Sequence, residues 1–269
     1  MDNRPIGIFD SGLGGLTCVR EVMDIMPNEN IIYFGDTGRV PYGTRSRETI
    51  VKYTEQDIRF LKSFDIKYII IACGTASSAA LPHIAEKFDT EICGVVEPTA
   101  SRAAEMTRNG KVAVLGTAGT VNSGKYREVI CGCNSDIQVI QQPCSLFVPI
   151  VENGHTHDKL ARLVVEEYLP AVKEFGADTV ILGCTHYPLL TDLIQEYLGD
   201  GVRLVDSGAC AAEYAKKQLV EKNMCSNRGK TGETQYFVSD SAEGFEELGG
   251  RFLQRELFGQ VQKIEIERY

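Results

Sequence analysis

Two cysteines stand at the ends of apolar segments, and each is followed closely by threonine. Cys73 lies in the run "IIIACGT" and Cys184 in the run "VILGCTH". A thiolate is both a nucleophile and a base, and neighbouring groups can tune its pKa from a reference value of about 8.5 toward neutrality. Nucleophilic use needs one cysteine with a histidine as its base, and His186 is the only histidine near either thiol in the sequence. Two thiols instead suit the inversion of a stereocentre, which needs a base on one face of a carbon and an acid on the other.

The surroundings of the two cysteines repeat along the chain. Eight candidate strands fall into two sets of four, and the third strand of each set ends in one of the cysteines. The first strand of each set leads into a small-residue turn, "GIFDSGLGG" or "AVLGTAGT", and the fourth ends in an acid, Glu97 or Asp206. This repetition predicts two lobes related by a pseudo-twofold axis. Because ligands of open parallel sheets bind at the carboxyl ends of the strands, both cysteines should face one cleft.

Short β-branched segments alternate with longer segments of helical periodicity, which predicts an α/β fold. Near-continuous apolar strands joined by helices indicate parallel sheets covered on both faces. We therefore expect two lobes, each with a mostly parallel four-stranded sheet flanked by helices, and an active site between them. The candidate strands are 6–9, 31–34, 68–72, 92–96, 112–115, 137–140, 180–182 and 203–205, and the clearest crossover helices are 47–64 and 158–175.

The chain after Asp206 does not begin a third set. It contains a helix-like segment over 210–219, the strand-like "TQYFVS", and a last helix over 242–258 with Phe245, Leu248, Phe252 and Leu253 on one apolar face. We assign this tail to the first lobe, which then comprises residues 1–96 and 207–269, and the second lobe comprises residues 97–206. A separate C-terminal cap is the alternative.

Bulk composition bounds the class of protein. The 269 residues are 43% hydrophobic, and the formal net charge is −9 with scattered lysines and arginines, so nucleic-acid binding has no electrostatic support. No apolar run reaches the roughly 18 residues of a membrane span, and the N-terminus lacks the pattern of a signal peptide. We expect a cytoplasmic protein without a membrane partner.

The remaining cysteines do not predict a metal centre or disulfides. Nine cysteines without a secretion signal indicate reduced thiols. Cys131, Cys133 and Cys144 lack a second pair to complete a zinc tetrad, and His155 and His157 have no regular ligand spacing to them. Cys18, Cys93, Cys210 and Cys225 are interpreted as inert core residues.

A nucleotide cofactor is not expected either. The glycine-rich run over 12–15 does not spell GxGxxG, and no acidic residue follows it at the spacing of a ribose ligand.

Over almost its full length the chain resembles the glutamate racemase family. The segments that carry the resemblance are "GIFDSGLGGLT", "YFGDTGRVPYG", "ACGTASS", "GTAGTVNSGKY", "FVPIVENG" and "LGCTHYPLL". The wider family includes racemases that act on aspartate and related decarboxylating enzymes, but "YFGDTGRVPYG" and "DSGLGG" favour the glutamate branch. The resemblance implies cofactor-independent interconversion of L- and D-glutamate, a supply of D-glutamate for peptidoglycan synthesis, and a homodimer.

The resemblance also implies a role for particular residues. Cys73 and Cys184 are the expected acid and base for the two enantiomers, with Asp10 assisting Cys73 and the pair Glu152 and His186 assisting Cys184. From the residues alone, Asp10 would be interpreted as a turn residue and Glu152 as a solvated loop charge. Hydroxyl groups and loop amides at strand ends are suited to binding the carboxylate oxygens of a substrate. The expected substrate-binding residues are Asp10, Ser11, Tyr42, Gly43, Gly74, Thr75, Thr185 and His186.

One position departs from the family pattern. Gly74 stands where the family commonly has asparagine, so a side-chain amide is missing next to Cys73. The polar groups of the substrate then lose one donor unless the backbone N–H of Gly74 or a water takes its place, so affinity and substrate pose are the properties affected. Gly38, where alanine is usual, is a smaller change.

Two other functions remain open at this stage. A hydrolase or lyase would use Cys184 with His186 and leave Cys73 merely packed. A binding module would hold an acidic amino acid without turnover. Solvent deuterium separates them from a racemase, because racemisation alone requires deuterium at the α-carbon of the inverted product.

Overall fold

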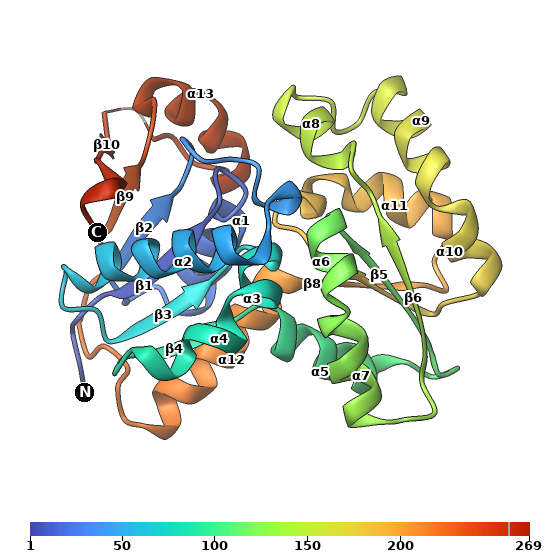
Figure 1. Ribbon diagram of the computed structural model, residues 1–269, viewed down its shortest axis with the longest axis horizontal. Helices are drawn as coiled ribbons and strands as arrows, with labels where there is room; N and C mark the ends of the chain where they lie inside the picture. The colour runs from blue at the N-terminus through green and yellow to red at the C-terminus, as the bar shows by residue number, and fades with distance from the viewer. Residues whose placement is uncertain (258) are drawn as a thin grey trace.

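The computed structural model describes residues 1–257 and 259–269, and it contains two parallel sheets side by side (Figure 1). The first sheet has the strand order β10-β9-β2-β1-β3-β4 and the second β6-β5-β7-β8. The strands are β1 (Ile6–Asp10), β2 (Ile31–Gly35), β3 (Tyr68–Ile71), β4 (Glu91–Gly94), β5 (Lys111–Gly116), β6 (Gln138–Pro143), β7 (Thr179–Leu182), β8 (Arg203–Asp206), β9 (Thr234–Val238) and β10 (Val261–Lys263). Every pairing is parallel, which confirms the expected α/β fold with two sheets.

The expected internal repeat appears as one strand order used twice. Strands β2-β1-β3-β4 of the first sheet correspond to β6-β5-β7-β8 of the second. The expectation of four strands in the first lobe was wrong, because β9 and β10 extend that sheet beyond β2. The segment "TQYFV" pairs with β2 from Ile31 to Gly35, so the edge of β2 is covered by the tail of the chain.

The helices follow the expected pattern with shifts at their ends. They are α1 (Leu16–Ile25), α2 (Arg47–Lys62), α3 (Gly74–Ala79), α4 (Leu81–Ile84), α5 (Val96–Met106), α6 (Ala118–Ser123), α7 (Lys125–Cys133), α8 (Phe147–Glu152), α9 (Lys159–Tyr168), α10 (Pro170–Phe175), α11 (Thr191–Leu198), α12 (Ser207–Glu221) and α13 (Ala242–Leu253), with 3-10 turns η1 (Tyr42–Thr44), η2 (Ala85–Lys87), η3 (Tyr187–Leu190) and η4 (Ile266–Arg268).

Three of the element boundaries that differ from the sequence-based expectations have a clear cause or consequence. The single helix expected over 158–175 is divided into α9 and α10, because Pro170 has no N–H for a continuous helix and begins a new one. Strand β4 ends at Gly94, so Glu97 lies in the first turn of α5 rather than at a strand end. Helix α13 ends at Leu253, where Gln254 adopts a left-handed conformation, and Phe258 lies outside the described residues.

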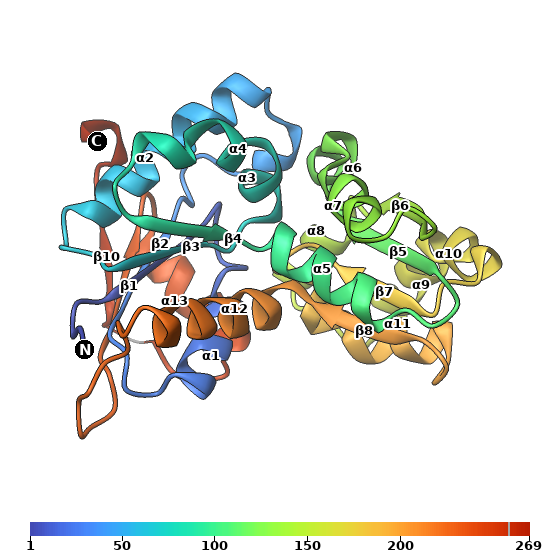
Figure 2. The ribbon, with the colours of Figure 1, turned by 90° about the horizontal axis from the view of Figure 1, so that it is seen from below.

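Both faces of each sheet are covered, which explains why every residue of β1, β2, β3 and β7 is buried. In β1, Ile6 and Ile8 belong to the core cluster beneath α1, whereas Phe9 belongs to the cluster beneath α2. Figure 2 shows α2 on one side of the first sheet and α1, α12 and α13 on the other, and it shows the second sheet between α5 and α7 on one side and α9 and α11 on the other. Helix α12 packs against α1 and α5 and so lies where the two lobes join.

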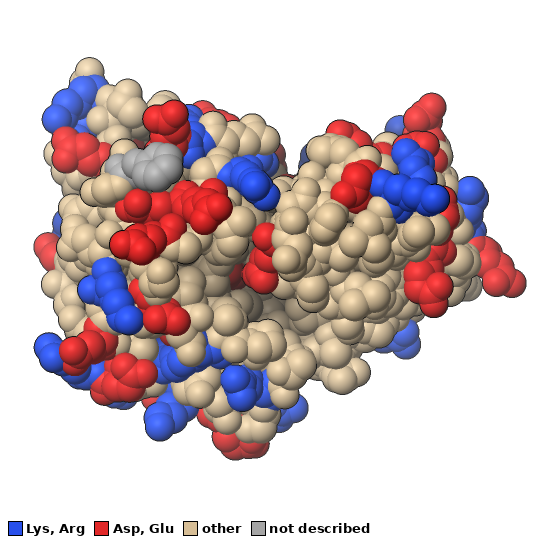
Figure 3. Space-filling model, turned by 90° about the horizontal axis from the view of Figure 1, so that it is seen from above, with Lys and Arg blue, Asp and Glu red and all other residues tan. Residues whose placement is uncertain are grey.

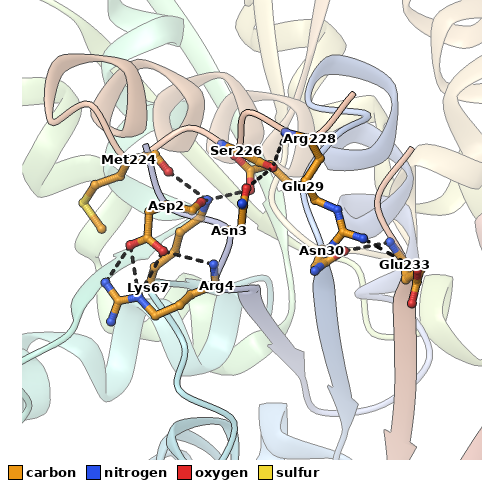
Figure 4. A network of polar contacts seen from close by, with 10 residues as sticks. All are labelled: Asp2, Asn3, Arg4, Glu29, Asn30, Lys67, Met224, Ser226, Arg228 and Glu233. Carbon is orange, nitrogen blue, oxygen red and sulfur yellow. Dashed lines mark hydrogen bonds and ion pairs between the residues drawn. The ribbon is translucent and has the colours of Figure 1, made fainter. Parts of the chain in front are cut away.

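A buried ion pair ties the N-terminal segment and the segment between α12 and β9 to the first sheet (Figure 4). The Lys67 ammonium, with a fully buried side chain, donates to the Glu29 carboxylate at 2.6 Å and to the carbonyl oxygens of Asp2 at 2.7 Å and Met224 at 2.8 Å. The other Glu29 oxygen accepts from the Ser226 amide at 2.7 Å. The assignment of residues 207–269 to the first lobe agrees with these contacts, but the lobe boundaries at residues 96 and 206 stay a prediction.

Within the described residues, no helix is long and apolar enough to cross a membrane.

Candidate active site

A cavity of about 340 Å³ lies between the lobes at the carboxyl ends of their strands. Figure 3 shows the surface hollowed between the two lobes. The first lobe lines the cavity with the turn after β1, with residues 40–44 around η1, and with the residues that follow β3. The second lobe lines it with the residues that follow β5 and β7 and with helix α8. All eleven residues expected at the site line this cavity: Asp10, Ser11, Tyr42, Gly43, Cys73, Gly74, Thr75, Glu152, Cys184, Thr185 and His186.

Cys73 is positioned by the N-terminus of α3. Its sulfur accepts from the Ala76 amide at 3.5 Å and contacts the Ser11 hydroxyl at 3.6 Å. The side chain is only 5% exposed. Burial, followed by the negative charge of Asp10, raises the pKa of the Cys73 thiol to about 12, although the contacts with Ala76 and Ser11 act in the opposite direction. Cys73 is therefore a thiol at neutral pH, ready to deliver a proton.

Asp10 ends β1 and is almost completely buried at the bottom of the cavity. One carboxylate oxygen accepts from the Gly12 amide at 3.0 Å, and the other accepts from the Thr185 hydroxyl at 3.5 Å. The second of these bonds joins the two lobes. Burial raises the pKa of Asp10, while the charge on His186 and the amides around the turn act in the opposite direction.

Cys184 has a histidine and a carboxylate beside it instead. The Cys184 sulfur lies 3.9 Å from Nδ1 of His186, and Nε2 of His186 lies 3.0 Å from the Glu152 carboxylate. Burial alone would lower the pKa of His186, but its contacts with Cys184 and Glu152 outweigh burial and raise the pKa to about 10. His186 is therefore an imidazolium at neutral pH, and it places a positive charge beside the Cys184 sulfur.

The two thiols thus have opposite electrostatic surroundings. A buried carboxylate lies near Cys73, and an imidazolium lies beside Cys184. A neighbouring cation favours the charged form of an acid and a neighbouring anion disfavours it. The two cysteines that line the cavity therefore lie close to charges of opposite sign.

Hydroxyl groups from both lobes meet at the cavity wall. The Thr75 hydroxyl lies 2.9 Å from that of Thr117 and 3.5 Å from that of Thr120, and the last two are 3.0 Å apart. Thr117 caps the N-terminus of α6 through the Thr120 amide. These groups suit carboxylate oxygens, because hydroxyls and helix N-termini both donate hydrogen bonds.

Sequence reasoning missed several cavity residues, notably Thr117, Thr120, Cys144 and Ser145. A signal for Thr117 was present. It occupies the turn "GTAGT" of the second repeat, which corresponds to the turn of Asp10 and Ser11 in the first. Cys144 and Ser145 lie after β6, and no feature of their sequence marks them as cavity residues.

Tyr42 reaches the cavity differently from the expectation. Its hydroxyl donates to Asp36 and lies 3.0 Å from the Asp57 carboxyl, so it points into the protein below the cavity wall. The phenol hydroxyl is consequently hydrogen-bonded within the protein. Tyr42 and the adjacent Gly43 still line the cavity, but not through this hydroxyl.

Gly74 lies where the end of β3 in the first lobe approaches the end of β7 in the second. A Cβ atom at this position would lie 2.5 Å from the Gly183 carbonyl oxygen, a distance that real Cβ atoms do not adopt. The asparagine common in the family cannot be accommodated here without moving the end of β3 away from the end of β7. Glycine therefore allows the two cysteine-bearing turns to approach closely.

The described residues contain no cluster of three or more His, Cys, Asp or Glu side chains placed to hold a metal ion.

The site is that of a two-lobed α/β protein with a thiol from each lobe in one buried cavity, and residues 17–215 match the Asp/Glu/Hydantoin racemase family. The chain belongs to this family. It is 44% identical over 264 residues to the glutamate racemase of Geobacter metallireducens, covering 98% of this chain and 97% of the relative. The glutamate racemase of Lactococcus lactis is 42% identical over 272 residues, covering 100% and 98%. The crystal structure of Francisella tularensis glutamate racemase in complex with D-glutamate superposes with a TM-score of 0.92 at 37% identity and covers all of both chains.

Proposed function

We propose that the protein racemises glutamate, with Cys73 and Cys184 exchanging protons with the two faces of the substrate's α-carbon. The observation that carries the proposal is the placement of the two thiols in one cavity between lobes built on the same strand order. The relatives that match the whole chain at 40% identity or more are glutamate racemases, which supports glutamate as the substrate.

The charges beside the two thiols support one assignment of their roles in the first turnover. Cys184, beside the His186 imidazolium, acts as the base, and the Cys73 thiol acts as the acid. One turnover moves one proton from the α-carbon to Cys184 and another from Cys73 to the opposite face. The protein is left with Cys184 as thiol and Cys73 as thiolate, so it is ready for the reverse reaction or for proton exchange with solvent.

The chemical difficulty is that the α-proton of an amino acid is far less acidic than a thiol. The transition state therefore carries negative charge that the site must stabilise. The hydroxyl groups of Thr75, Thr117 and Thr185 and the turn amides supply fixed donors in a largely buried cavity, where such interactions are stronger than in water. The retained ammonium of the substrate adds a positive charge next to the α-carbon.

The first test is circular dichroism of enantiopure L-glutamate with the purified protein and no added cofactor. The signal is expected to decay to zero, and in deuterated water deuterium should enter the α-carbon. Cys73→Ala and Cys184→Ala should each abolish racemisation in both directions, because each turnover needs both thiols. Cys93→Ala, which removes a buried thiol outside the cavity, is the matched control.

Other outcomes point to other functions. A flat signal with L-glutamate and decay with aspartate would assign the protein to aspartate. Full activity of Cys73→Ala would contradict the two-thiol mechanism and favour a single thiol, Cys184 with His186. Binding of glutamate without any loss of optical rotation would favour a binding module.

The resemblance further leads us to propose that the protein supplies D-glutamate for peptidoglycan synthesis and acts as a homodimer in the cytoplasm. Analytical ultracentrifugation tests the dimer, and D-glutamate auxotrophy after deletion of the gene tests the pathway.

A further inference from the structure

A cluster of buried charged groups lies directly beneath one wall of the cavity. The wall is the segment 40–44, which lines the cavity over its whole length. Beneath it, Asp36 and Asp57 are completely buried, Tyr42 is 1% exposed and the side chain of Arg39 is 10% exposed. Asp36 follows β2 and Asp57 lies on α2, so the cluster joins the wall to two elements of the first lobe. None of the proton-transfer steps described above uses these four residues.

The guanidinium of Arg39 bonds to both carboxyl groups. Its Nε donates to Asp36 at 2.7 Å and its Nη2 donates to Asp57 at 2.8 Å, while Nη1 donates to Gln56 at 2.6 Å. The second oxygen of Asp36 accepts from the Ser239 hydroxyl at 2.8 Å. Two carboxyl groups therefore share a single cation in the interior.

The number of protons decides the charge of the cluster. The Tyr42 oxygen is within hydrogen-bond distance of Oδ2 of both Asp36 and Asp57. A phenol has only one proton to donate, and an ionised carboxylate has none. Since Tyr42 donates to Asp36, the second contact is a hydrogen bond only if Asp57 itself carries a proton and donates it to the Tyr42 oxygen.

The charges lead to the same assignment. With both carboxyl groups ionised, the buried cluster would hold two negative charges against one positive charge, and an uncompensated buried charge is very costly. With Asp57 protonated, Asp36 and Arg39 cancel. Burial, followed by the neighbouring charge of Asp36, raises the pKa of Asp57 well above its ordinary value, whereas Arg39 and the Tyr42 hydroxyl oppose that change.

We propose that Asp57 is a neutral carboxylic acid at neutral pH and a positioning residue, which together with Asp36, Arg39 and Tyr42 fixes the wall segment 40–44 of the catalytic cavity. The chain of bonds runs from Asp57 through the Tyr42 oxygen to Asp36, and Arg39 closes the ring. It holds the backbone of Tyr42 and Gly43 against the cavity. The proposal concerns the shape of the wall and holds whichever substrate the cavity accepts.

Asparagine and leucine at position 57 separate this role from simple packing. Both have nearly the branched shape of aspartate, but only asparagine repeats the hydrogen bonds of a protonated acid, with an N–H toward Tyr42 and an oxygen toward Arg39. We expect Asp57→Asn to keep KM and kcat within about twofold of the starting protein. We expect Asp57→Leu to raise KM about 10-fold with a smaller change in kcat, because it leaves Arg39 and Tyr42 each short of one partner in the wall.

The protonation state has a direct readout that packing does not affect. Carbon-13 NMR of protein labelled at the aspartate γ-carbon should show, near neutral pH, a protonated carboxyl resonance that disappears in Asp57→Asn. In Asp36→Asn the resonance of Asp57 should move to the ionised position, because Arg39 then needs the charge of Asp57. These signals do not depend on turnover, so they test the assignment even if the protein does not racemise glutamate.

Two results would overturn the proposal. One is the absence, near neutral pH, of any protonated aspartate resonance that Asp57→Asn removes. The other is an equal rise in KM for Asp57→Asn and Asp57→Leu, since this would mean that an ionised Asp57 is required. If Asp57→Leu fails to fold, the NMR comparison of the unmodified protein with Asp57→Asn and Asp36→Asn still decides.

Discussion

Replacing Glu152 by glutamine tests whether His186 has to be positively charged. The change keeps the shape of the side chain and a hydrogen bond to Nε2 of His186, but it removes the carboxylate 3.0 Å away that helps to raise the pKa of His186 to about 10. A hydrogen bond to a charged group is worth about 1.5–3 kcal/mol, and about 1.4 kcal/mol corresponds to one pH unit. The pKa of His186 should therefore fall by about one to two pH units.

The sign of the pH effect follows from this change. With a pKa of about 10, His186 is protonated at neutral pH and still largely protonated near pH 9. In Glu152→Gln the protonated fraction declines earlier as the pH rises. The activity of the variant relative to the starting protein should therefore drop about two- to tenfold between about pH 7 and pH 9. The smaller figure is favoured because the Glu152 side chain is 40% exposed and water screens its charge.

The assay is the initial rate of loss of circular dichroism from L-glutamate and, separately, from D-glutamate. Because enantiomers have equal free energies, kcat/KM must change by the same factor in both directions, which provides an internal check. Asp158→Asn is the matched control, since it removes a carboxylate 2.5 Å from His155, a histidine outside the cavity. A Glu152→Gln profile parallel to that of the starting protein over the whole pH range would refute the argument.

Three further changes test the fold and the site. Gly74→Ala should lower kcat/KM about 10-fold or more, because the added Cβ would meet the Gly183 carbonyl oxygen and overpacking of this kind costs about 1–3 kcal/mol. Unchanged kinetics would show instead that the two lobes separate freely. Lys67→Met should destabilise the protein by about 3–5 kcal/mol in urea unfolding, because it leaves the Glu29 carboxylate buried without its cation, and a loss below about 1 kcal/mol would contradict the role given to this pair. Since the pKa of Asp57 is raised on folding, its contribution to stability is complete at low pH and is lost as the pH rises. The free energy of unfolding of Asp57→Asn minus that of the starting protein should therefore increase with pH above about pH 4, and an unchanged difference would contradict a protonated Asp57.

The sequence predicted the architecture because the signals for it are local and repeated. Short apolar runs that alternate with segments of helical periodicity indicate strands covered on both faces, and the two cysteine-bearing runs occupy the same place in each repeat. Parallel strands bring their carboxyl ends to one edge, so Cys73 and Cys184 could be assigned to one cleft before their positions were known. The strand order of the first sheet was not predictable in full, because β9 pairs with β2, which lies about 200 positions earlier in the chain, and β10 then pairs with β9.

The chemical character of each cysteine was decided by the tertiary structure. Both cysteines are followed closely by threonine, and the nearby titratable His186 distinguishes their local sequences. The difference comes from partners that are distant in the chain: Glu152 reaches His186 from α8, and Asp10 reaches the surroundings of Cys73 from β1. A pKa depends on burial and on charges within a few ångströms, and both are properties of the folded chain.

Tyr42 and Gly74 also show the difference between what the sequence predicts and what the folded structure decides. The motif "YFGDTGRVPYG" marks Tyr42 as a site residue, but only packing against α2 turns its hydroxyl away from the cavity and toward Asp57. The glycine at position 74 is visible as a departure from the family pattern, but its reason is the Gly183 carbonyl of the other lobe. The sequence by itself thus determined which residue types meet at the cavity, because strand ends and repeats are encoded locally. The tertiary structure alone decided their protonation, their orientation and the distance between the lobes, because these depend on atoms brought together only by folding.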